Sequence, residues 1–516
     1  MKKILGLSLL TLAASAVFAA PLTPGNLLVV QVGEDGRATA PSSTGTQVYI
    51  KEYTTAGVLV QSFPLETTTA PRLVNSGTAT SALQISGYLG NYAIAGYDAA
   101  LGTTGIATSA SASVNRVVAV LKNDGTISYT ALSDAYDGNN IRSAVSDGTN
   151  IWMAGTAGTG LQATAGFRHA LVGGTTSIAV NDPTTTVNNT RVINIFNGQL
   201  YGGSGSGLLN GVAAIGTGLP TVTGQSVTAL PNLVDPVNTP TPSPYDFAFA
   251  DDGNTIYVTD DRIQASGGGL LKYTFDGTQW NFQYRLQSGL PATNAAGTSF
   301  AGTRSVDVVE SGSDNIIYVV SANQNSGTAL VNTSGVYVVT DTGALSAFTQ
   351  VANSALNTNF RGVEVVREAA RVVSGVVTFD NGYIGTDLVN VTFEVTDGST
   401  TQTEVIAIDP ATGTYSFPVD SAITASSVDV FAKAPTHLRL LKAGYSVGSP
   451  ANFALINGDV DADNSVTIFD YIELSGSFDL NVGDSGFVDG ADLDKDGSVT
   501  IFDYIILSDN FDKSGD

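Results

Sequence analysis

Two stretches near the end of the chain have almost the same sequence: Asp459-Val-Asp-Ala-Asp-Asn-Ser-Val-Thr-Ile-Phe-Asp470 and Asp492-Leu-Asp-Lys-Asp-Gly-Ser-Val-Thr-Ile-Phe-Asp503. Each places side-chain oxygens at positions 1, 3, 5, 9 and 12 of a twelve-residue loop. Because a hard cation such as Ca²⁺ takes about six to eight oxygen ligands, this spacing predicts two calcium sites. Position 6 needs a sharp turn, and it holds Asn464 or Gly497, which both tolerate a positive φ.

The expected ligands are the carboxylates at positions 1, 3, 5 and 12, the carbonyl at position 7, and the hydroxyl at position 9, directly or through a water. In the first loop they are Asp459, Asp461, Asp463, Ser465, Thr467 and Asp470, and in the second loop Asp492, Asp494, Asp496, Ser498, Thr500 and Asp503. Each loop runs directly into an apolar segment that we expect to be helical. The repeated unit is therefore a calcium loop followed by one helix.

This unit, which has no entering helix, resembles a type I dockerin over residues 457–511, and its two copies lie 33 residues apart. The resemblance implies two Ca²⁺ ions, folding that depends on them, and docking onto a cohesin through loop positions 10 and 11. Those positions hold the same pair of residues in both copies, as a two-way symmetric binding surface requires: Ile468, Phe469, Ile501 and Phe502. The resemblance also implies a short β-bridge between the loops at position 8, at Val466 and Val499.

The chain departs from the family within the helices. Dockerins of cellulosomal enzymes commonly carry a basic pair there, whereas this chain has Gly476-Ser477 and Asp509-Asn510. A cohesin-like partner is therefore one interpretation. The alternative is intramolecular docking, in which the calcium region packs onto the domain that precedes it.

The first residues predict export. Lys2 and Lys3 precede an apolar run at residues 4–12 and small residues up to Ala19, a pattern typical of a signal peptide over residues 1–19. No later stretch approaches the length of a membrane span, so we expect a secreted protein. The chain has no cysteine, which excludes disulfides and cysteine-ligated metals. Its net charge of −24 argues against nucleic acid as a partner.

Residues 20–370 read as many short strands separated by glycine-rich turns. A loose repeat starts near residues 81, 141, 190, 245, 303 and 360, a period suited to four-stranded propeller blades. The last copy lacks a following strand, and Asn26-Leu-Leu-Val-Val-Gln-Val at the other end can pair with it and close the ring. We therefore expect a mainly β fold with a six-bladed propeller. Seven blades, paired β-sandwiches and a solenoid are the alternatives.

Residues 371–456 have a different strand spacing. Gly413-Thr-Tyr-Ser-Phe and its neighbours resemble a carboxypeptidase-regulatory-like β-sandwich, which implies a structural spacer. Phe453-Ala-Leu-Ile-Asn-Gly-Asp then enters the first calcium loop without a flexible linker. We expect this sandwich and the dockerin-like region at residues 457–516 to pack together.

Little in the sequence indicates catalysis. The only histidines, His169 and His437, lack a nucleophile-elbow motif near them. Several carboxylates near predicted turns could form a glycosidase pair, namely Asp251, Asp252, Asp260, Asp261, Asp307 and Glu364. Local turn chemistry explains such aspartates more simply, because their side chains bond backbone amides two residues on. We identify no catalytic residue.

An arginine recurs at the head of the predicted inner strands, at Arg142, Arg191, Arg304 and Arg361. A propeller would gather these side chains on one rim of its channel, where they could bind an anionic ligand such as a uronate or a sulfated sugar. The alternative is that each arginine pairs with a neighbouring acid such as Asp307 or Glu364.

Together these features predict a secreted, non-catalytic binding or scaffold protein whose calcium module attaches it to a protein or cell surface. The alternative is a dockerin-bearing propeller glycoside hydrolase or polysaccharide lyase that acts in polysaccharide breakdown.

Overall fold

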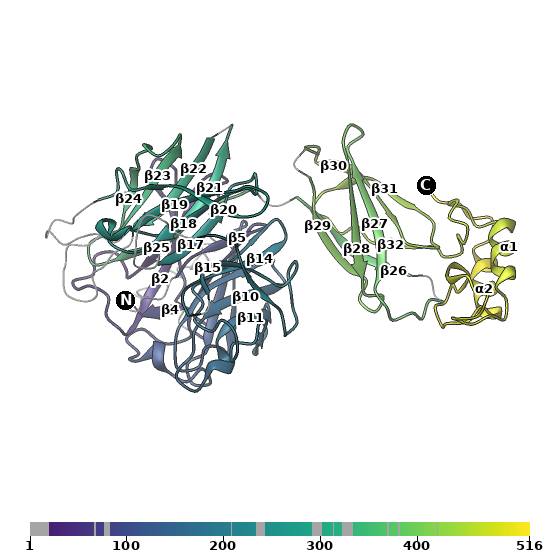
Figure 1. Ribbon diagram of the computed structural model, residues 1–516, viewed down its shortest axis with the longest axis horizontal. Helices are drawn as coiled ribbons and strands as arrows, with labels where there is room; N and C mark the ends of the chain where they lie inside the picture. Colours follow the sequence, from purple (N-terminus) through teal and green to yellow (C-terminus); the bar gives the residue numbers. More distant parts are fainter. Residues whose placement is uncertain are drawn as a thin grey trace, which may run out of the picture. The chain divides into compact units, whose positions relative to one another are not determined.

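The computed structural model describes residues 20–66, 69–76, 83–207, 209–233, 243–291, 302–312, 314–321, 334–368, 371–379, 382–420 and 422–516. The predicted signal peptide, residues 1–19, lies outside this range. The chain divides into two compact units, Met1–Ala369 and Ala370–Asp516 (Figure 1). Among the described residues, no helix has the length and apolar character needed to cross a membrane.

Within the described residues of the first unit, we divide the antiparallel strands into six groups of four, of which the first two belong to one nine-stranded sheet. Group 1 is β25 (Asn359–Val365), β1 (Leu27–Val32), β2 (Gly45–Tyr53) and β3 (Leu59–Pro64). Group 2 is β5 (Ser86–Tyr88), β6 (Asn91–Tyr97), β7 (Arg116–Lys122) and β8 (Ile127–Leu132). The short strand β4 (Val74–Ser76) pairs with both β2 and β6 and so joins the two groups. Group 3 is β9 (Ile141–Ser146), β10 (Asn150–Gly155), β11 (Gly166–Leu171) and β12 (Ile178–Ala179). Group 4 is β13 (Val192–Phe196), β14 (Gln199–Ser206), β15 (Leu209–Ile215) and β16 (Val227–Ala229).

The remaining groups have the same antiparallel order. Group 5 is β17 (Pro244–Phe249), β18 (Thr255–Asp260), β19 (Gly269–Phe275) and β20 (Trp280–Leu286); group 6 is β21 (Thr303–Ser311), β22 (Asp314–Ser321), β23 (Gly335–Asp341) and β24 (Thr349–Asn353). The predicted pairing of the last repeat with the start of the chain is confirmed, because β25 pairs with β1 from Leu27 opposite Val365 onward.

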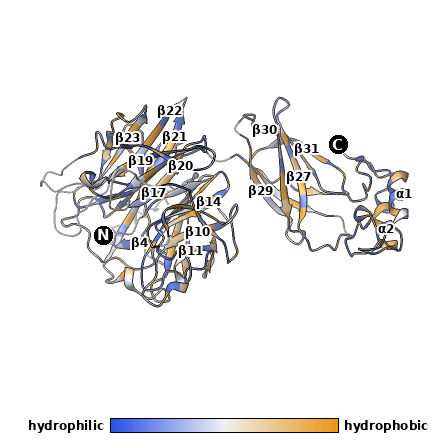
Figure 2. Cartoon of the chain, viewed as in Figure 1, coloured by the Kyte–Doolittle hydropathy of each residue, from blue (hydrophilic) through white to orange (hydrophobic). Residues whose placement is uncertain are grey.

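Apolar clusters lie between consecutive groups, and the apolar residues follow the strands (Figure 2). In one such cluster Trp152 and Phe167 of group 3 pack with Ile193 of group 4. A further cluster joins Val29 of group 1 to Val320 of group 6. Each sheet therefore buries both faces against its neighbours, and the sixth group packs on the first, as expected of propeller blades.

The short strand β5 and the residues before it lie among the first strands of other groups. Leu83 N donates to Arg142 O over 3.1 Å, Gln84 Nε2 donates to Arg304 O over 3.1 Å, and Ser86 Oγ donates to Ile193 O over 3.2 Å. Gln84 is fully buried. This segment therefore lies at the centre of the unit, where a propeller was expected to have a channel.

In the second unit, two sheets share one core. One contains β28 (Thr401–Ile408), β27 (Val389–Thr396), β30 (Ser427–Lys433) and β31 (Leu440–Ser446); the other contains β29 (Thr414–Pro418), β26 (Val372–Thr378) and β32 (Phe453–Ala454). Phe393 and Tyr415, from opposite sheets, stack with ring centroids 4.2 Å apart. We call this part the two-sheet region.

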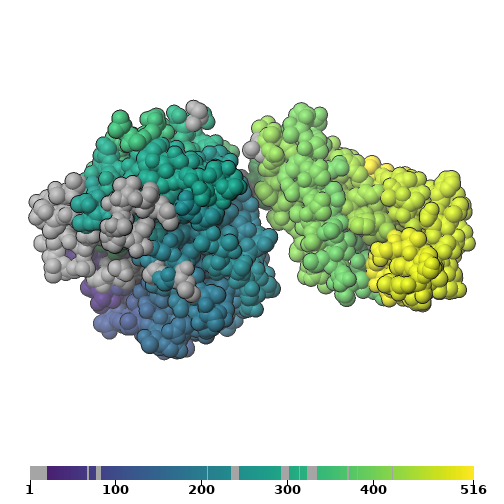
Figure 3. All heavy atoms as spheres, viewed as in Figure 1, coloured from purple at the N-terminus to yellow at the C-terminus, as the bar shows by residue number. Residues whose placement is uncertain are grey.

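The rest of the second unit is the calcium-loop region, residues 457–516, with helices α1 (Ile468–Gly476) and α2 (Ile501–Asp509). Leu438, which follows β30, is fully buried in its core beside Val466 and Val499. Asp459 N also donates to Thr436 O over 2.9 Å, and Ile384 N donates to Asp494 O over 2.9 Å. The two-sheet region thus supplies part of the surface on which both loops rest (Figure 3).

Candidate calcium centre

Each helix begins at a capped threonine that also ends a loop. Thr467 Oγ1 accepts from Phe469 N over 3.2 Å, and Asp470 Oδ2 accepts from Thr467 N over 2.7 Å. Thr500 and Asp503 repeat this capping box with the same distances, 3.2 Å from Phe502 N and 2.7 Å from Thr500 N. The threonine at position 9 and the aspartate at position 12 are therefore fixed by the helix start.

The position-12 carboxylates also reach back across their loops. Asp470 Oδ1 accepts from Val460 N over 2.7 Å and from Asp461 N over 3.1 Å. Asp503 Oδ1 accepts from Leu493 N over 2.6 Å and from Asp494 N over 3.1 Å. Both carboxylates are fully buried. These bonds close each loop into a ring around the other acidic side chains.

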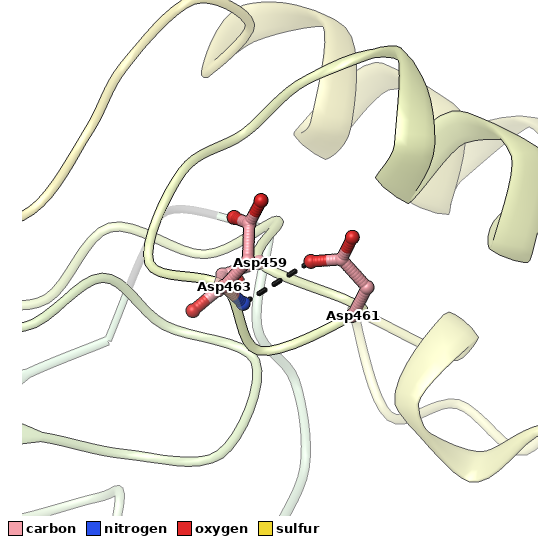
Figure 4. A group of neighbouring side chains, drawn as sticks. All are labelled: Asp459, Asp461 and Asp463. Carbon is pink, nitrogen blue, oxygen red and sulfur yellow. Dashed lines mark hydrogen bonds between the residues drawn. The ribbon is translucent and has the colours of Figure 1, made fainter.

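Within each ring, the carboxylates of positions 1, 3 and 5 come together. Oxygens of Asp459, Asp461 and Asp463 all lie within 4.8 Å of one another, and the same holds for the second set, Asp492, Asp494 and Asp496. Figure 4 shows the first set, in which Asp463 N donates to Asp461 Oδ1 over 3.1 Å. The cluster offers three hard oxygen donors to one point, the donor type that Ca²⁺ prefers.

Two residues in each loop, at positions 4 and 6, have positive φ. Asn464 and Gly497 at position 6 have φ of 70° and 91°, as the sequence predicts. Ala462 and Lys495 at position 4 are also left-handed, with φ of 63° and 62°. The conformation at position 4 was not predicted, because alanine and lysine do not favour it.

Burial and neighbouring charges raise the pKa of three of the loop carboxylates, Asp461, Asp492 and Asp494. Burial, followed by the nearby charges of Asp503, Asp496 and Asp492, raises the pKa of Asp494 to about 6. Burial also raises the pKa of Asp492 and of Asp461. Asp492 Oδ1 is buried and has no hydrogen-bond partner among the described residues. A divalent cation would remove both the repulsion and the unsatisfied oxygen, so the residues fit Ca²⁺.

The first loop differs from the second in one contact. Lys433 Nζ, at the end of β30, lies 2.9 Å from Asp459 Oδ2. Asp459 Oδ1 accepts from Asn464 N, as Asp492 Oδ2 accepts from Gly497 N. Lys433 therefore lies on the oxygen that corresponds to the unsatisfied Asp492 Oδ1. No sequence pattern predicts this lysine, because it lies 26 residues before Asp459 and on another element.

The remaining predicted ligands lie at the ends of the loops. Ser465 N donates to Asp463 Oδ1 over 2.9 Å, and Ser498 N donates to Asp496 Oδ1 over 2.8 Å. The predicted bridge between Val466 and Val499 is wrong. Instead Val466 N donates to Lys513 O after α2, and Val499 N donates to Leu480 O after α1. Each loop therefore pairs with the chain that leaves the opposite helix, because both valines are buried in the shared core.

The apolar residues at positions 10 and 11 lie on the surface in both copies. Ile468 and Ile501 are 52% and 53% exposed, and Phe469 and Phe502 are 62% and 61% exposed. One turn further along, Tyr471 and Tyr504 contact each other with ring centroids 5.8 Å apart. The two helices thus present the same apolar residues with the same exposure.

The carboxylates considered for catalysis are held by structural bonds. Asp307 forms a two-bond ion pair with Arg367, with both distances 2.8 Å, and accepts from Val365 N over 2.7 Å. Burial and the charge of Asp307 raise the pKa of Glu364. Asp252 accepts from Asn254 N and Thr255 N, each over 2.8 Å, as turn chemistry predicts.

Two of the other candidate carboxylates pair with arginines. Asp260 pairs with Arg262 over 2.7 Å, and Asp261 pairs with Arg304 over 3.4 Å. Asp251 is exposed. His169 lies 2.9 Å from Asn150 Oδ1, and buried His437 packs on Phe379. These contacts explain both histidines as parts of the packed structure.

No family model and no curated protein matches the sequence. Among solved structures, an interface mutant of a type II cohesin–X–dockerin complex from Acetivibrio cellulolyticus is 21% identical over 28% of this chain and 97% of that chain, with a TM-score of 0.24. A putative 6-phosphogluconolactonase from Bacteroides fragilis is 11% identical over 66% and 98%, with a TM-score of 0.34. The periplasmic gluconolactonase of Pseudomonas aeruginosa is 12% identical over 77% and 97%, also with a TM-score of 0.34. At such TM-scores, function has to be argued from the residues of this chain.

Proposed function

We propose that this chain is an exported, non-catalytic binding protein that attaches to another protein through a calcium-loaded, dockerin-like module at residues 457–516. Residues 371–456 form a β-sandwich spacer, and residues 20–370 form a six-bladed propeller as a binding platform. Export rests on the signal-like pattern at residues 1–19. The observation that carries the docking function is the duplicated apolar surface directly after two duplicated acid clusters.

The bound ions supply positive charge that holds the clustered carboxylates together. Residues at loop positions 1, 3, 5, 7, 9 and 12 hold them: Asp459, Asp461, Asp463, Ser465, Thr467, Asp470, Asp492, Asp494, Asp496, Ser498, Thr500 and Asp503. Because Thr467 and Thr500 also cap the helices, filling the loops and ordering the helices are one event. Docking is therefore calcium-dependent.

The docking surface consists of Ile468 and Phe469 on α1 and Ile501 and Phe502 on α2. Large apolar side chains that are more than half exposed cost free energy in water, and they commonly mark contact sites for other proteins. Since both copies match in identity and exposure, either can make the same contact. A cohesin-like protein suits such a two-way surface.

A non-catalytic role is supported by the carboxylates of the first unit. Asp246 Oδ1 accepts a hydrogen bond from Phe247 N, and Asp246 Oδ2 accepts one from Val306 N. The side chain of Asp246 therefore links β17 to β21. Asp307 in turn fastens β21 to β25 through Val365 N. Carboxylates that link neighbouring sheets in this way have a structural role. Product release from a polysaccharide panel that is lost in Asp307→Asn, with folding retained, would overturn this part of the proposal.

The docking test uses the chain without residues 1–19 and a panel of immobilised type I and type II cohesins. We expect binding in calcium that is lost in EDTA. Phe469→Asp and Phe502→Asp should each retain binding, whereas the double variant should lose more than about hundredfold in affinity. Leu345→Asp, at an exposed leucine of the first unit, is the matched control. Binding that persists in EDTA or in the double variant would contradict the proposal.

A further inference from the structure

Two of the four recurrent arginines of the first unit, Arg191 and Arg304, contact the same aromatic side chain. Tyr245, at the start of β17, is buried. Arg191 Cζ lies 5.0 Å from the centroid of its ring, and Arg304 Cζ lies 4.9 Å from the same centroid. These arginines come from groups 4 and 6, on either side of group 5. Tyr245 is thus the point at which guanidinium groups from two neighbouring sheets meet.

The other two arginines, Arg142 and Arg361, lie close enough to this pair for its charges to lower their pKa. Burial, and then the charge of Arg304, lowers the pKa of Arg361 to about 10. Burial also lowers the pKa of Arg142, and the charge of Arg191 adds to this effect. Both also interact electrostatically with Tyr245. We call these four residues the arginine cluster.

Two members of the cluster, Arg142 and Arg191, donate hydrogen bonds to uncharged acceptors. Arg142 Nη1 donates to Asn189 Oδ1 and Thr190 O, over 2.5 Å and 2.9 Å. Arg191 Nη1 donates to Ser243 Oγ and Pro244 O, over 3.0 Å and 2.8 Å. These acceptors are uncharged, so the hydrogen bonds orient the guanidinium groups without neutralising them.

For Arg142, Arg191 and Arg304, the ion pairs among the described residues include a single carboxylate. Arg304 Nη2 lies 3.4 Å from Asp261 Oδ2. The neighbouring Asp260 already holds Arg262. Among the described residues, Asp307 and Glu364 pair with Arg367, over 2.8 Å and 3.9 Å, and not with these three arginines as the sequence left open.

Glycine at position 205 makes room for one guanidinium. A Cβ atom at Gly205 would lie only 2.4 Å from Arg191 Nη1. The backbone of β14 therefore lets Arg191 approach closely, and its hydrogen bonds to Ser243 and Pro244 hold it there. This is a fitted position for a charged group and differs from that of a surface arginine.

Gathering several guanidinium groups in one half-buried place is unfavourable, because like charges repel and burial removes water. It is unexpected in a chain whose net charge is −24. An oxyanion resolves the conflict, because guanidinium groups bind carboxylates and sulfates through paired, charge-assisted hydrogen bonds. We propose that the arginine cluster is a binding site for an oxyanion, the carboxylate or sulfate group of a ligand.

Two sources carry this chemistry: a free inorganic anion and an acidic sugar. The test measures both on the chain without residues 1–19, at constant ionic strength and constant calcium chloride. Isothermal titration calorimetry uses sodium sulfate in one arm and methyl glucuronide in the other, with methyl glucoside as the neutral control. We expect binding of sulfate or glucuronide and no binding of methyl glucoside. Tighter binding of glucuronide identifies an acidic sugar as the source, and equal binding identifies the anionic group alone.

Three variants separate a binding role from a structural role. Arg304→Gln and Arg191→Gln should each weaken anion binding by about tenfold or more. Asp261→Asn, which removes the carboxylate that pairs with Arg304, should strengthen binding. Arg37→Gln removes a partly buried arginine of the same unit that pairs with Glu34, and it should leave anion binding unchanged.

Arg304→Gln and Asp261→Asn break the same ion pair, but they should change the affinity for the anion in opposite directions. This difference separates a binding role from a structural role. If that pair is only structural, both variants will lower the melting temperature equally and neither will change anion binding. That result would overturn the proposal, as would the absence of sulfate and glucuronide binding in the unaltered chain.

Discussion

The two calcium loops have nearly the same sequence and local structure, but their surroundings differ. Asp459 of the first loop faces the ammonium group of Lys433, whereas Asp492 Oδ1 of the second loop is buried without a partner among the described residues. A positive charge therefore already stands beside the first loop in the absence of metal. The comparison predicts that two nearly identical loops differ in calcium affinity, because an ammonium group lies directly on the position-1 carboxylate of the first loop, 2.9 Å from Asp459 Oδ2.

Calcium removal should have the largest effect and should act on both loops. We expect a stoichiometry of two ions, with a contribution of about 4 kcal/mol per ion to the free energy of unfolding when free calcium exceeds Kd by a thousandfold. Differential scanning calorimetry in calcium and in EDTA measures this loss for residues 370–516. The transition of the first unit serves as the internal control. Identical melting in the two buffers would contradict the proposed sites.

Lys433→Met should make the calcium affinities of the two loops more similar. Without the competing ammonium group, calcium affinity at the first loop should rise by about tenfold, or about 1.4 kcal/mol. The measurement is calorimetric titration in an Asp492→Asn background, where only the first loop binds calcium. Lys495→Met is the matched control, because Lys495 bonds Asp489 and does not contact a ligand. An unchanged affinity in Lys433→Met would show that the lysine moves away at no cost.

Charge removal at position 1 should have opposite effects in the two loops when metal is absent. Asp459→Asn breaks the pair with Lys433 and should lower the free energy of unfolding in EDTA by about 1 kcal/mol. Asp492→Asn keeps an oxygen for Gly497 N and relieves repulsion from Asp494 and Asp503, so it should raise that free energy. Chemical denaturation in EDTA measures both. Changes of the same sign would mean that Lys433 does not distinguish the loops.

The smallest expected effect on stability concerns the left-handed residue at position 4, which both loops share. Ala462→Gly and Lys495→Gly should each stabilise the second unit by about 0.5 kcal/mol, because glycine relieves the left-handed strain but loses more entropy on folding. The gains should be equal when Lys495→Gly is compared with Lys495→Ala, because both of these variants lack the pair with Asp489 and φ is 63° and 62° at the two positions. Thermal melts in calcium test this, and unequal gains would mean that the loops differ in backbone as well as in environment.

Much of the local structure followed from the sequence because it depends on neighbouring residues. Thr467 and Thr500 precede apolar helical segments and cap them, and Asn464 and Gly497 stand where the loops turn. The pairing of β25 with β1 was also predictable, since a repeat that ends one strand short needs a partner. Left-handed Ala462 and the partner of Val466 were missed, because neither residue type indicates its conformation or contact.

The sequence by itself determined the two acid loops, their helices and the strand repeat, since hydrogen-bond spacing and apolar periodicity act over a few residues. Only the tertiary structure decided that Lys433 lies against Asp459, that Leu438 completes the core between the loops, and that arginines of separate sheets meet at Tyr245. Those contacts join residues far apart in the chain. Their existence depends on how whole sheets pack, which no local pattern encodes.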